Sequence, residues 1–283
     1  MAACSCRETA EKGVRMSAVS RIIRFRECAG KQRGVVIRTA LLFAGVLCLA
    51  LPGFAGDQFF QKSYPLPSGG SFLLENVNGS IQIDGWARDE VEVRAVKIAQ
   101  YDSRDLTQVK IDVENRPGQV FVRTLYPQGK GAEVFVKYHV YVPSRVLLSA
   151  IETVNGDVLV RGIAGAGDLR SVNGNVEVLG SSGWFNARTT NGNLRLELSK
   201  LRAGAPMNLE TVNGSVVLGL PPNADANLTV LHMNGGFSSE LPMTSAMGAA
   251  TARSFHAKLG AGGGEISVRT VNGGIRLVRE PNV

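Results

Sequence analysis

Cysteine is almost missing from this 283-residue sequence, and its few copies are all near the start. The chain has four, and the last of them is Cys48. From residue 49 onward the sequence therefore excludes disulfides, thiolate metal sites and a cysteine nucleophile. The three histidines form neither a His-Glu-x-x-His nor a His-x-His motif, so no zinc site is predicted for them. They are His139, His232 and His256.

Long apolar runs are also scarce, and the clearest one, residues 39–51, is shorter than the ~20 residues that span a bilayer. It follows a basic stretch that ends at Arg38. Gly53 and Ala55 then supply the small residues that signal peptidase requires at minus three and minus one. We therefore expect residues 1–56 to be a signal peptide that is removed, which makes the mature chain periplasmic or extracellular, with no transmembrane segment.

Two alternatives to this interpretation of the leader stay open. Lipid attachment at Cys48 is the first, although Leu47 is too large for the usual lipoprotein signal. A membrane anchor is the second. The leader is long, so Met16 is an alternative start of the chain.

Excess positive charge is absent once the leader is set aside. The leader carries nine Lys or Arg and three Asp or Glu, which leaves 22 basic and 21 acidic residues of the chain's 31 and 24. The net charge thus falls from +7 to about +1. Nucleic-acid binding through counterion release needs a basic surface, so we expect no nucleic-acid partner.

What the sequence does contain is a repeat. The dipeptide Asn-Gly occurs seven times, usually after Thr-Val or Ser-Val, and the two successive spacings that follow Asn155 are both 18 residues. The predicted repeat turns are Asn78-Gly79, Asn155-Gly156, Asn173-Gly174, Asn191-Gly192, Asn213-Gly214, Asn234-Gly235 and Asn272-Gly273.

Each repeat reads as strand, turn, strand. Three and five residues after the Asn the side chain is almost always Val, Ile or Leu, which is the period of a half-buried strand. Asn-Gly tolerates the positive φ of a tight turn. One unit of about 18 residues cannot bury its own apolar face, so the units must share a core. We favour a β-solenoid, and the alternative is an antiparallel sandwich or meander of hairpins.

Stacking in sequence order makes a prediction about charge. Three residues before the Asn, Glu152 would lie beside Arg170, and Arg188 beside Glu210. Such exposed pairs contribute about 0.2 to 1 kcal/mol each. The asparagines would either form an amide ladder or serve only the backbone geometry, and both readings stay open. In this order the last repeat, with its charged end from Arg276, would close the stack.

The mature chain divides by composition into residues 57–150 and 151–283. The first part holds eleven of the fifteen mature aromatic residues and long alternating segments, such as residues 133–142, that predict an antiparallel β-rich region. The second part is the repetitive solenoid. Helix is expected only as a turn or two within residues 103–108 and 245–252.

These patterns together resemble a family of adhesin-like bacterial envelope proteins, long catalogued as a domain of unknown function. The resemblance rests on Leu74 to Trp86, on the following Asp89-Glu-Val-Glu-Val-Arg, on Val142-Pro143, and on the serial Thr-Val-Asn-Gly copies. It covers nearly all of residues 57–283. It implies an exported, β-solenoid-like protein with no assigned catalysis, and it carries over no site residue.

No catalytic or cofactor motif emerges from the sequence. Catalytic β-helices cluster carboxylates on one exposed face, and here only Glu177 and Glu197 could approach each other on neighbouring rungs. The predicted function is therefore a non-enzymatic binding or structural scaffold of the cell envelope, without cofactor or metal, whose partner is an envelope glycan or a protein. The alternative is a polysaccharide lyase or hydrolase on a β-helix.

Overall fold

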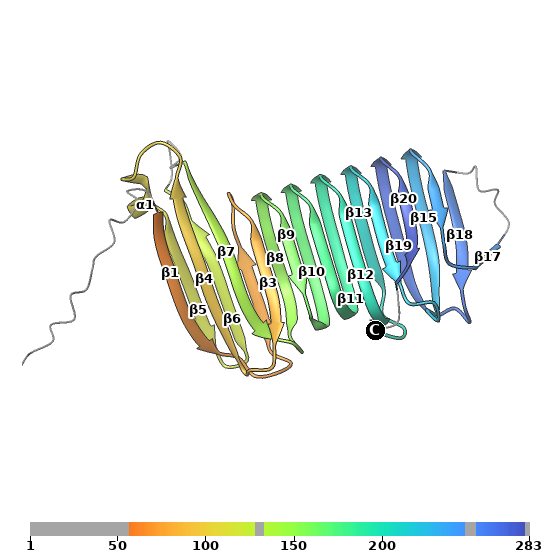
Figure 1. Ribbon diagram of the computed structural model, residues 1–283, viewed down its shortest axis with the longest axis horizontal. Helices are drawn as coiled ribbons and strands as arrows, with labels where there is room; N and C mark the ends of the chain where they lie inside the picture. The colour runs from red at the N-terminus through yellow and green to blue at the C-terminus, as the bar shows by residue number, and fades with distance from the viewer. Residues whose placement is uncertain (1–56, 128–132, 247–252, 281–283) are drawn as a thin grey trace, which may run out of the picture. The chain divides into compact units, whose positions relative to one another are not determined.

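A computed structural model describes residues 57–127, 133–246 and 253–280, and the predicted leader lies outside these residues. Most of the described residues are in strands, and the described part has one short helix (Figure 1). None of the described helices is long and apolar enough to cross a membrane. The elements are β1 (Asp57–Pro65), β2 (Ser71–Glu75), β3 (Ile81–Trp86), β4 (Glu90–Ala99), α1 (Asp105–Gln108), β5 (Lys110–Arg116), β6 (Gln119–Leu125), β7 (Val134–Pro143), β8 (Leu147–Asn155), β9 (Val158–Arg161), β10 (Ala164–Asn173), β11 (Val176–Asn191), β12 (Leu194–Leu201), β13 (Met207–Asn213), β14 (Val216–Leu220), β15 (Ala226–Asn234), β16 (Phe237–Ser239), β17 (Met243–Ala246), β18 (Ser254–Leu259), β19 (Gly264–Asn272) and β20 (Ile275–Arg279).

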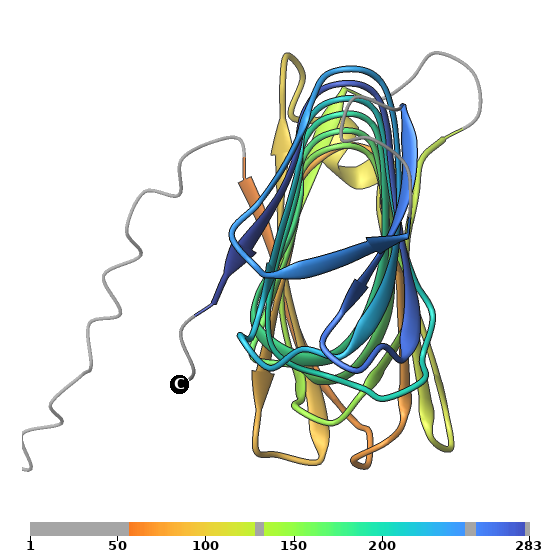
Figure 2. The same cartoon turned by 90° about the vertical axis from the view of Figure 1, so that its right-hand side faces the viewer.

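The strands form two facing layers, seen end-on in Figure 2. We call the layer whose strands lead into the Asn-Gly bends sheet one, and the layer that follows the bends sheet two. Sheet one runs β5, β6, β2, β8, β10, the second half of β11, β13, β19, β15, β18 and β17. Sheet two runs β1, β4, β7, β3, β9, the first half of β11, β12, β14, β20 and β16.

Successive repeats stack as parallel, in-register strands, which confirms the β-solenoid prediction over the hairpin alternative. Asn155 pairs with Asn173, and Asn173 with Asn191. The alternating Val, Ile and Leu side chains of both sheets point inward and form one continuous hydrophobic cluster. Each rung therefore buries its apolar face against the opposite sheet and against its two neighbouring rungs.

The rungs are not stacked in sequence order at the C-terminal end. β19 pairs with β13 on one side and with β15 on the other, and β20 likewise lies between β14 and β16. The expectation that the last repeat closes the stack is therefore wrong. The spacing of 38 residues between Asn234 and Asn272 arises because β16 of the outer rung and two antiparallel strands, β17 and β18, lie between them in the sequence.

The N-terminal end mixes both strand directions. β4 pairs antiparallel with β1 and β7, and β5 with β6, as the sequence predicts. β6 and β7 also pair in parallel with β2 and β3, so they form an outer rung of the same stack. The division of the mature chain at residue 150 stays a prediction. Helix α1 lies within residues 103–108, the first segment expected to be helical. In the second expected segment, residues 245–252, residues 245 and 246 belong to strand β17, and residues 247–252 lie outside the described residues.

Candidate functional site

Each residue of the Thr-Val-Asn-Gly motif has a different environment. The Thr side chain is buried, and its hydroxyl donates to the Gly carbonyl of the preceding rung. Thr189 Oγ1, for example, lies 2.8 Å from Gly174 O. The Val side chain is exposed or half-exposed at the corner, as at Val172. The same hydroxyl contact is made by Thr153, Ser171, Thr211 and Thr270.

The Asn side chains form a continuous amide ladder along this corner. Each Nδ2 donates to the Oδ1 of the next Asn, and all six distances are 2.8 Å. Of the two roles left open by the sequence, the ladder is therefore present. Its spatial order is Asn78, Asn155, Asn173, Asn191, Asn213, Asn272 and Asn234.

The glycines of the motif are required mainly by close approach between rungs. A Cβ on Gly192 would overlap the carbonyl oxygen of Gly174, and the same holds at every step of the column. Four of these glycines do not have a positive φ, so the prediction of positive φ at the turn is wrong for them. They are Gly156, Gly174, Gly192 and Gly214; Gly79, Gly235 and Gly273 do have positive φ.

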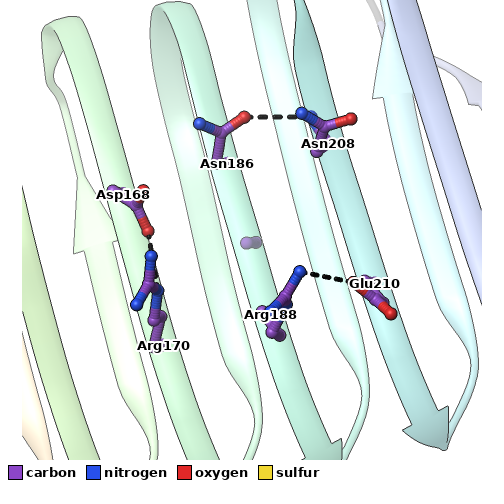
Figure 3. Close-up of a pocket in the computed structure, with 7 residues that line it drawn as sticks. Asp168, Arg170, Asn186, Arg188, Asn208 and Glu210 are labelled. Carbon is purple, nitrogen blue, oxygen red and sulfur yellow. Dashed lines mark hydrogen bonds and ion pairs between the residues drawn. The ribbon is translucent and has the colours of Figure 1, made fainter.

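A polar cleft of about 160 Å³ lies on the outer surface of sheet one (Figure 3). Arg170 pairs with Asp168 at 3.2 Å and with Glu152 at 3.4 Å, and Arg188 pairs with Glu210 at 2.7 Å. The two column pairs expected from the sequence are therefore both formed. The cleft is lined by Asp168, Arg170, Asn186, Ala187, Arg188, Asn208 and Glu210, from β10, β11 and β13.

Two asparagines, Asn186 and Asn208, lie in the cleft beside the charged side chains. Asn186 Oδ1 accepts a hydrogen bond from the backbone N of Asn208 at 3.0 Å (Figure 3). Trp184 precedes Asn186 by two residues on β11 and so lies on the same face of the strand. Sequence reasoning missed Asp168, Asn186 and Asn208. All three lie five residues before a repeat Asn, so a column count at that position is the signal that finds them.

The carboxylates considered for catalysis lie on sheet two. Glu177 is in register with Arg195, and Arg195 Nε donates to Glu197 Oε1 at 2.6 Å. Glu280, which sequence reasoning did not single out, lies where a Cβ on Gly219 would stand. Burial raises the pKa of Glu280, the Glu197 carboxylate raises it further, and Arg195 lowers it. The structure thus brings together Glu197 and Glu280.

The three histidines occupy unrelated surroundings. His139 Nε2 lies 2.6 Å from Asp84 Oδ2, and His256 Nδ1 lies 3.0 Å from Thr229 Oγ1. His232 takes the place of the buried Thr in the outermost rung. Within the described ranges, no group of three or more His, Cys, Asp or Glu side chains is placed to hold a metal ion.

An all-β solenoid of stacked parallel rungs, without a metal cluster in its described part, is the class of protein that these features define. The chain belongs to the Toastrack DUF4097 family, whose profile matches residues 71–278. The resemblance inferred from the sequence is thereby confirmed. No curated protein matches the chain.

Several solved structures are similar to this chain at low identity. One is a "putative cell adhesion protein" from Clostridium sporogenes, 9% identical, with a TM-score of 0.48, covering 79% of this chain and 100% of that one. A "putative adhesin" from Bacteroides fragilis is 9% identical, with a TM-score of 0.28, covering 79% and 97%. A "putative lipid binding protein" from Parabacteroides distasonis is 10% identical, with a TM-score of 0.24 and the same coverage.

Proposed function

We propose that this chain is an exported, non-enzymatic scaffold of the bacterial envelope, adhesin-like in function, whose sheet-one surface binds a glycan. The observation that carries the proposal is the polar cleft between β10, β11 and β13. It is the place where the repetitive face gathers acidic, basic and amide side chains around one hollow.

The chemistry of the cleft suits a hydroxyl-rich ligand. Its carboxylates accept hydrogen bonds, its guanidinium groups donate them, and its amides do both. Two arginines, one aspartate and one glutamate leave it without net charge, which favours a neutral polar ligand over a polyanion. Trp184 is not part of the cleft lining, but it lies two residues before Asn186 on the same face of β11 and adds an aromatic side chain to that face. Because rungs repeat every ~4.8 Å, the face also suits a polymer of regular repeat.

The same contacts support binding rather than catalysis in the cleft. A general acid needs a desolvated carboxyl group that stays protonated. Asp168 and Glu210 are instead partly exposed, and each is paired with an arginine. Such pairs hold polar groups in place at the surface, which suits recognition of a ligand.

Export is supported by the basic and apolar pattern of residues 1–56, which lie outside the described residues. Mass spectrometry of the protein recovered from an envelope fraction tests this directly. We expect an N-terminus near Asp57, and a chain that retains residues before Arg38 would contradict export with cleavage.

Glycan binding is tested by applying residues 57–283 to an array of envelope polysaccharides and peptidoglycan fragments. Arg188→Ala is expected to weaken binding about tenfold or more, since a hydrogen bond to a charged group contributes about 1.5 to 3 kcal/mol. Arg188 has a 65% exposed side chain, so the fold should not depend on it. Arg276→Ala, an exposed arginine on sheet two, is the matched control and should bind as the parent does.

Two outcomes would count against the glycan. If no polysaccharide is retained, or if both variants bind as tightly as the parent, the cleft is not a glycan site. A protein ligand captured through the same arginine would replace the glycan as the partner.

A second candidate, a polysaccharide lyase or hydrolase, is favoured by one observation, the raised pKa of Glu280 beside Glu197. A carboxyl group of raised pKa close to a second carboxylate is a usual acid and base arrangement of such enzymes. Release of reducing ends from a polysaccharide panel, abolished by Glu197→Gln and by Glu280→Gln, would establish it. If the Glu177→Gln variant still releases reducing ends, Glu177 has no role in the reaction.

A further inference from the structure

The last repeat of the chain is inserted inside the stack. β13 to β16 precede β19 and β20 in sequence, yet β19 lies between β13 and β15, and β20 between β14 and β16. The space for this rung is therefore bounded by strands that are already available before residues 264–279 are. Figure 1 shows β19 and β20 between these neighbours.

This inserted rung is held on both sides by repeat contacts. Gly214 N donates to Asn272 O at 2.9 Å, and Gly273 N donates to Asn234 O at 2.8 Å. The amide ladder passes through Asn272 to both neighbours. Thr270 Oγ1 donates to the carbonyl of Gly214 at 2.9 Å. Its inward side chains Ile266, Val268, Ile275 and Leu277 are at most 3% exposed.

A short glycine-rich link joins this rung to the rest of the chain. β18 and β19 flank β15 on opposite sides, so residues 260–263 pass across the start of β15. Three hydrogen bonds hold the link: Ala261 N donates to Asp225 Oδ1 at 2.6 Å, Asn227 Nδ2 donates to Gly263 O at 3.1 Å, and Gly262 N donates to Leu259 O at 2.9 Å. Gly260 and Gly262 have positive φ, and glycine can equally adopt extended backbone. Opening of the link would therefore break these hydrogen bonds, but its glycines can adopt the extended backbone that an open link needs.

We propose that residues 264–279 are an exchangeable strand pair, and that the space between β13–β14 and β15–β16 accepts the same segment of a second copy of this chain. In a reciprocal exchange every hydrogen bond and apolar contact of the rung is recovered, and only the link changes conformation. The partner is a second copy because the space fits this repeat with its Thr, Asn and Gly in register. The resulting dimer carries two sheet-one faces, which would raise the avidity of any surface ligand.

Single cysteines placed in the two halves of the interface test the exchange. Val217 and Arg276 are in register on β14 and β20. The ~4.8 Å spacing of paired strands lies within the Cα range of a disulfide. Residues 57–283 contain the whole described core and no cysteine. We would therefore unfold Val217→Cys and Arg276→Cys in one mixture, refold them together at high concentration, and oxidise.

The expected result is a disulfide-linked heterodimer of the two variants, together with a dimer by size-exclusion chromatography with light scattering. The double variant in one chain is the positive control and should form an internal disulfide. Glu177→Cys with Arg195→Cys is the matched negative pair, in register on β11 and β12 but outside the exchanged segment. It should give no heterodimer beyond background.

Two outcomes would overturn the proposal. If the double variant oxidises internally while the mixed single variants stay monomeric and unlinked, the segment does not exchange between copies. Equal cross-linking by the Glu177 and Arg195 pair would also overturn it, because that result means aggregation and not exchange.

Discussion

Alanine at Gly192 should destabilise the stack even though the backbone there accepts alanine. Gly192 is not among the glycines with positive φ. A role limited to the turn would therefore predict tolerance, or a gain of about 0.4 to 1 kcal/mol from the less flexible unfolded chain. A Cβ at this position would instead overlap the carbonyl oxygen of Gly174. The two rungs must separate to admit it.

The magnitude follows from the contacts that this separation weakens. Gly174 N donates to Asn191 O at 3.0 Å, and Thr189 Oγ1 donates to Gly174 O at 2.8 Å. A hydrogen bond contributes about 1 kcal/mol, and an unsatisfied buried hydroxyl costs about 1 to 3 kcal/mol. We therefore expect a loss of about 3 kcal/mol, or a decrease in Tm of about 6 to 12 °C for a domain of this size.

Gly236→Ala is the matched control, because a Cβ there meets nothing within 4 Å. Its stability should lie within about 0.5 kcal/mol of the parent. Thermal and urea unfolding, followed by far-ultraviolet circular dichroism, measures both variants. The urea m-value should be compared as well, because repeat proteins can unfold in parts. If Gly192→Ala is as stable as Gly236→Ala, the close-approach explanation is refuted.

Three further predictions concern the ladder, the outer rung and the buried phenols. Asn191→Ala removes one donated and one accepted amide bond at an exposed corner, and should lower the urea unfolding free energy by about 1 to 2 kcal/mol; an unchanged value would mean that the ladder contributes nothing. Among the described residues neither nitrogen of buried His232 has a hydrogen-bond partner, so His232→Thr should raise stability by about 1 kcal/mol, and a lower midpoint would contradict this. Burial raises the pKa of Tyr126 to about 12 and also raises that of Tyr138. Because these folded pKa values lie above the unfolded value of about 10, the stability that both phenols contribute is complete below pH ~10 and is lost as pH rises through the folded pKa. Ultraviolet titration should show Tyr126 and Tyr138 ionising well above pH ~10, and uniform titration near pH ~10 would refute this.

Sequence periodicity predicted the solenoid because each position has the same environment in every rung. Alternation placed Val and Leu inward, and the Asn column placed Glu152 beside Arg170. These predictions hold because parallel in-register stacking turns a sequence repeat directly into spatial neighbours. The reason for glycine was misjudged, since the approach of Gly192 to Gly174 is a contact between rungs and not a property of the local turn.

The cleft was only partly accessible from the sequence. Its arginines lie three residues before a repeat Asn, in the column whose charge pairs the sequence predicts, whereas Asn186 and Asn208 lie two residues earlier, in a column with no such pattern of opposite charges. The proximity of Glu280 to Glu197 depends on which rung the last strand joins. No periodicity count supplies that proximity.

The sequence by itself determined that the chain is all-β and which side chains face the core, and it favoured stacked repeats over hairpins, because those properties depend on a pattern that every rung shares. The tertiary structure alone decided the order of the rungs. Since repeats are interchangeable in their contacts, the position of Asn272 between Asn213 and Asn234 is set by the β17–β18 excursion and the glycine link across β15. That order brings Glu280 to Glu197 and places the final repeat where a second copy can replace it.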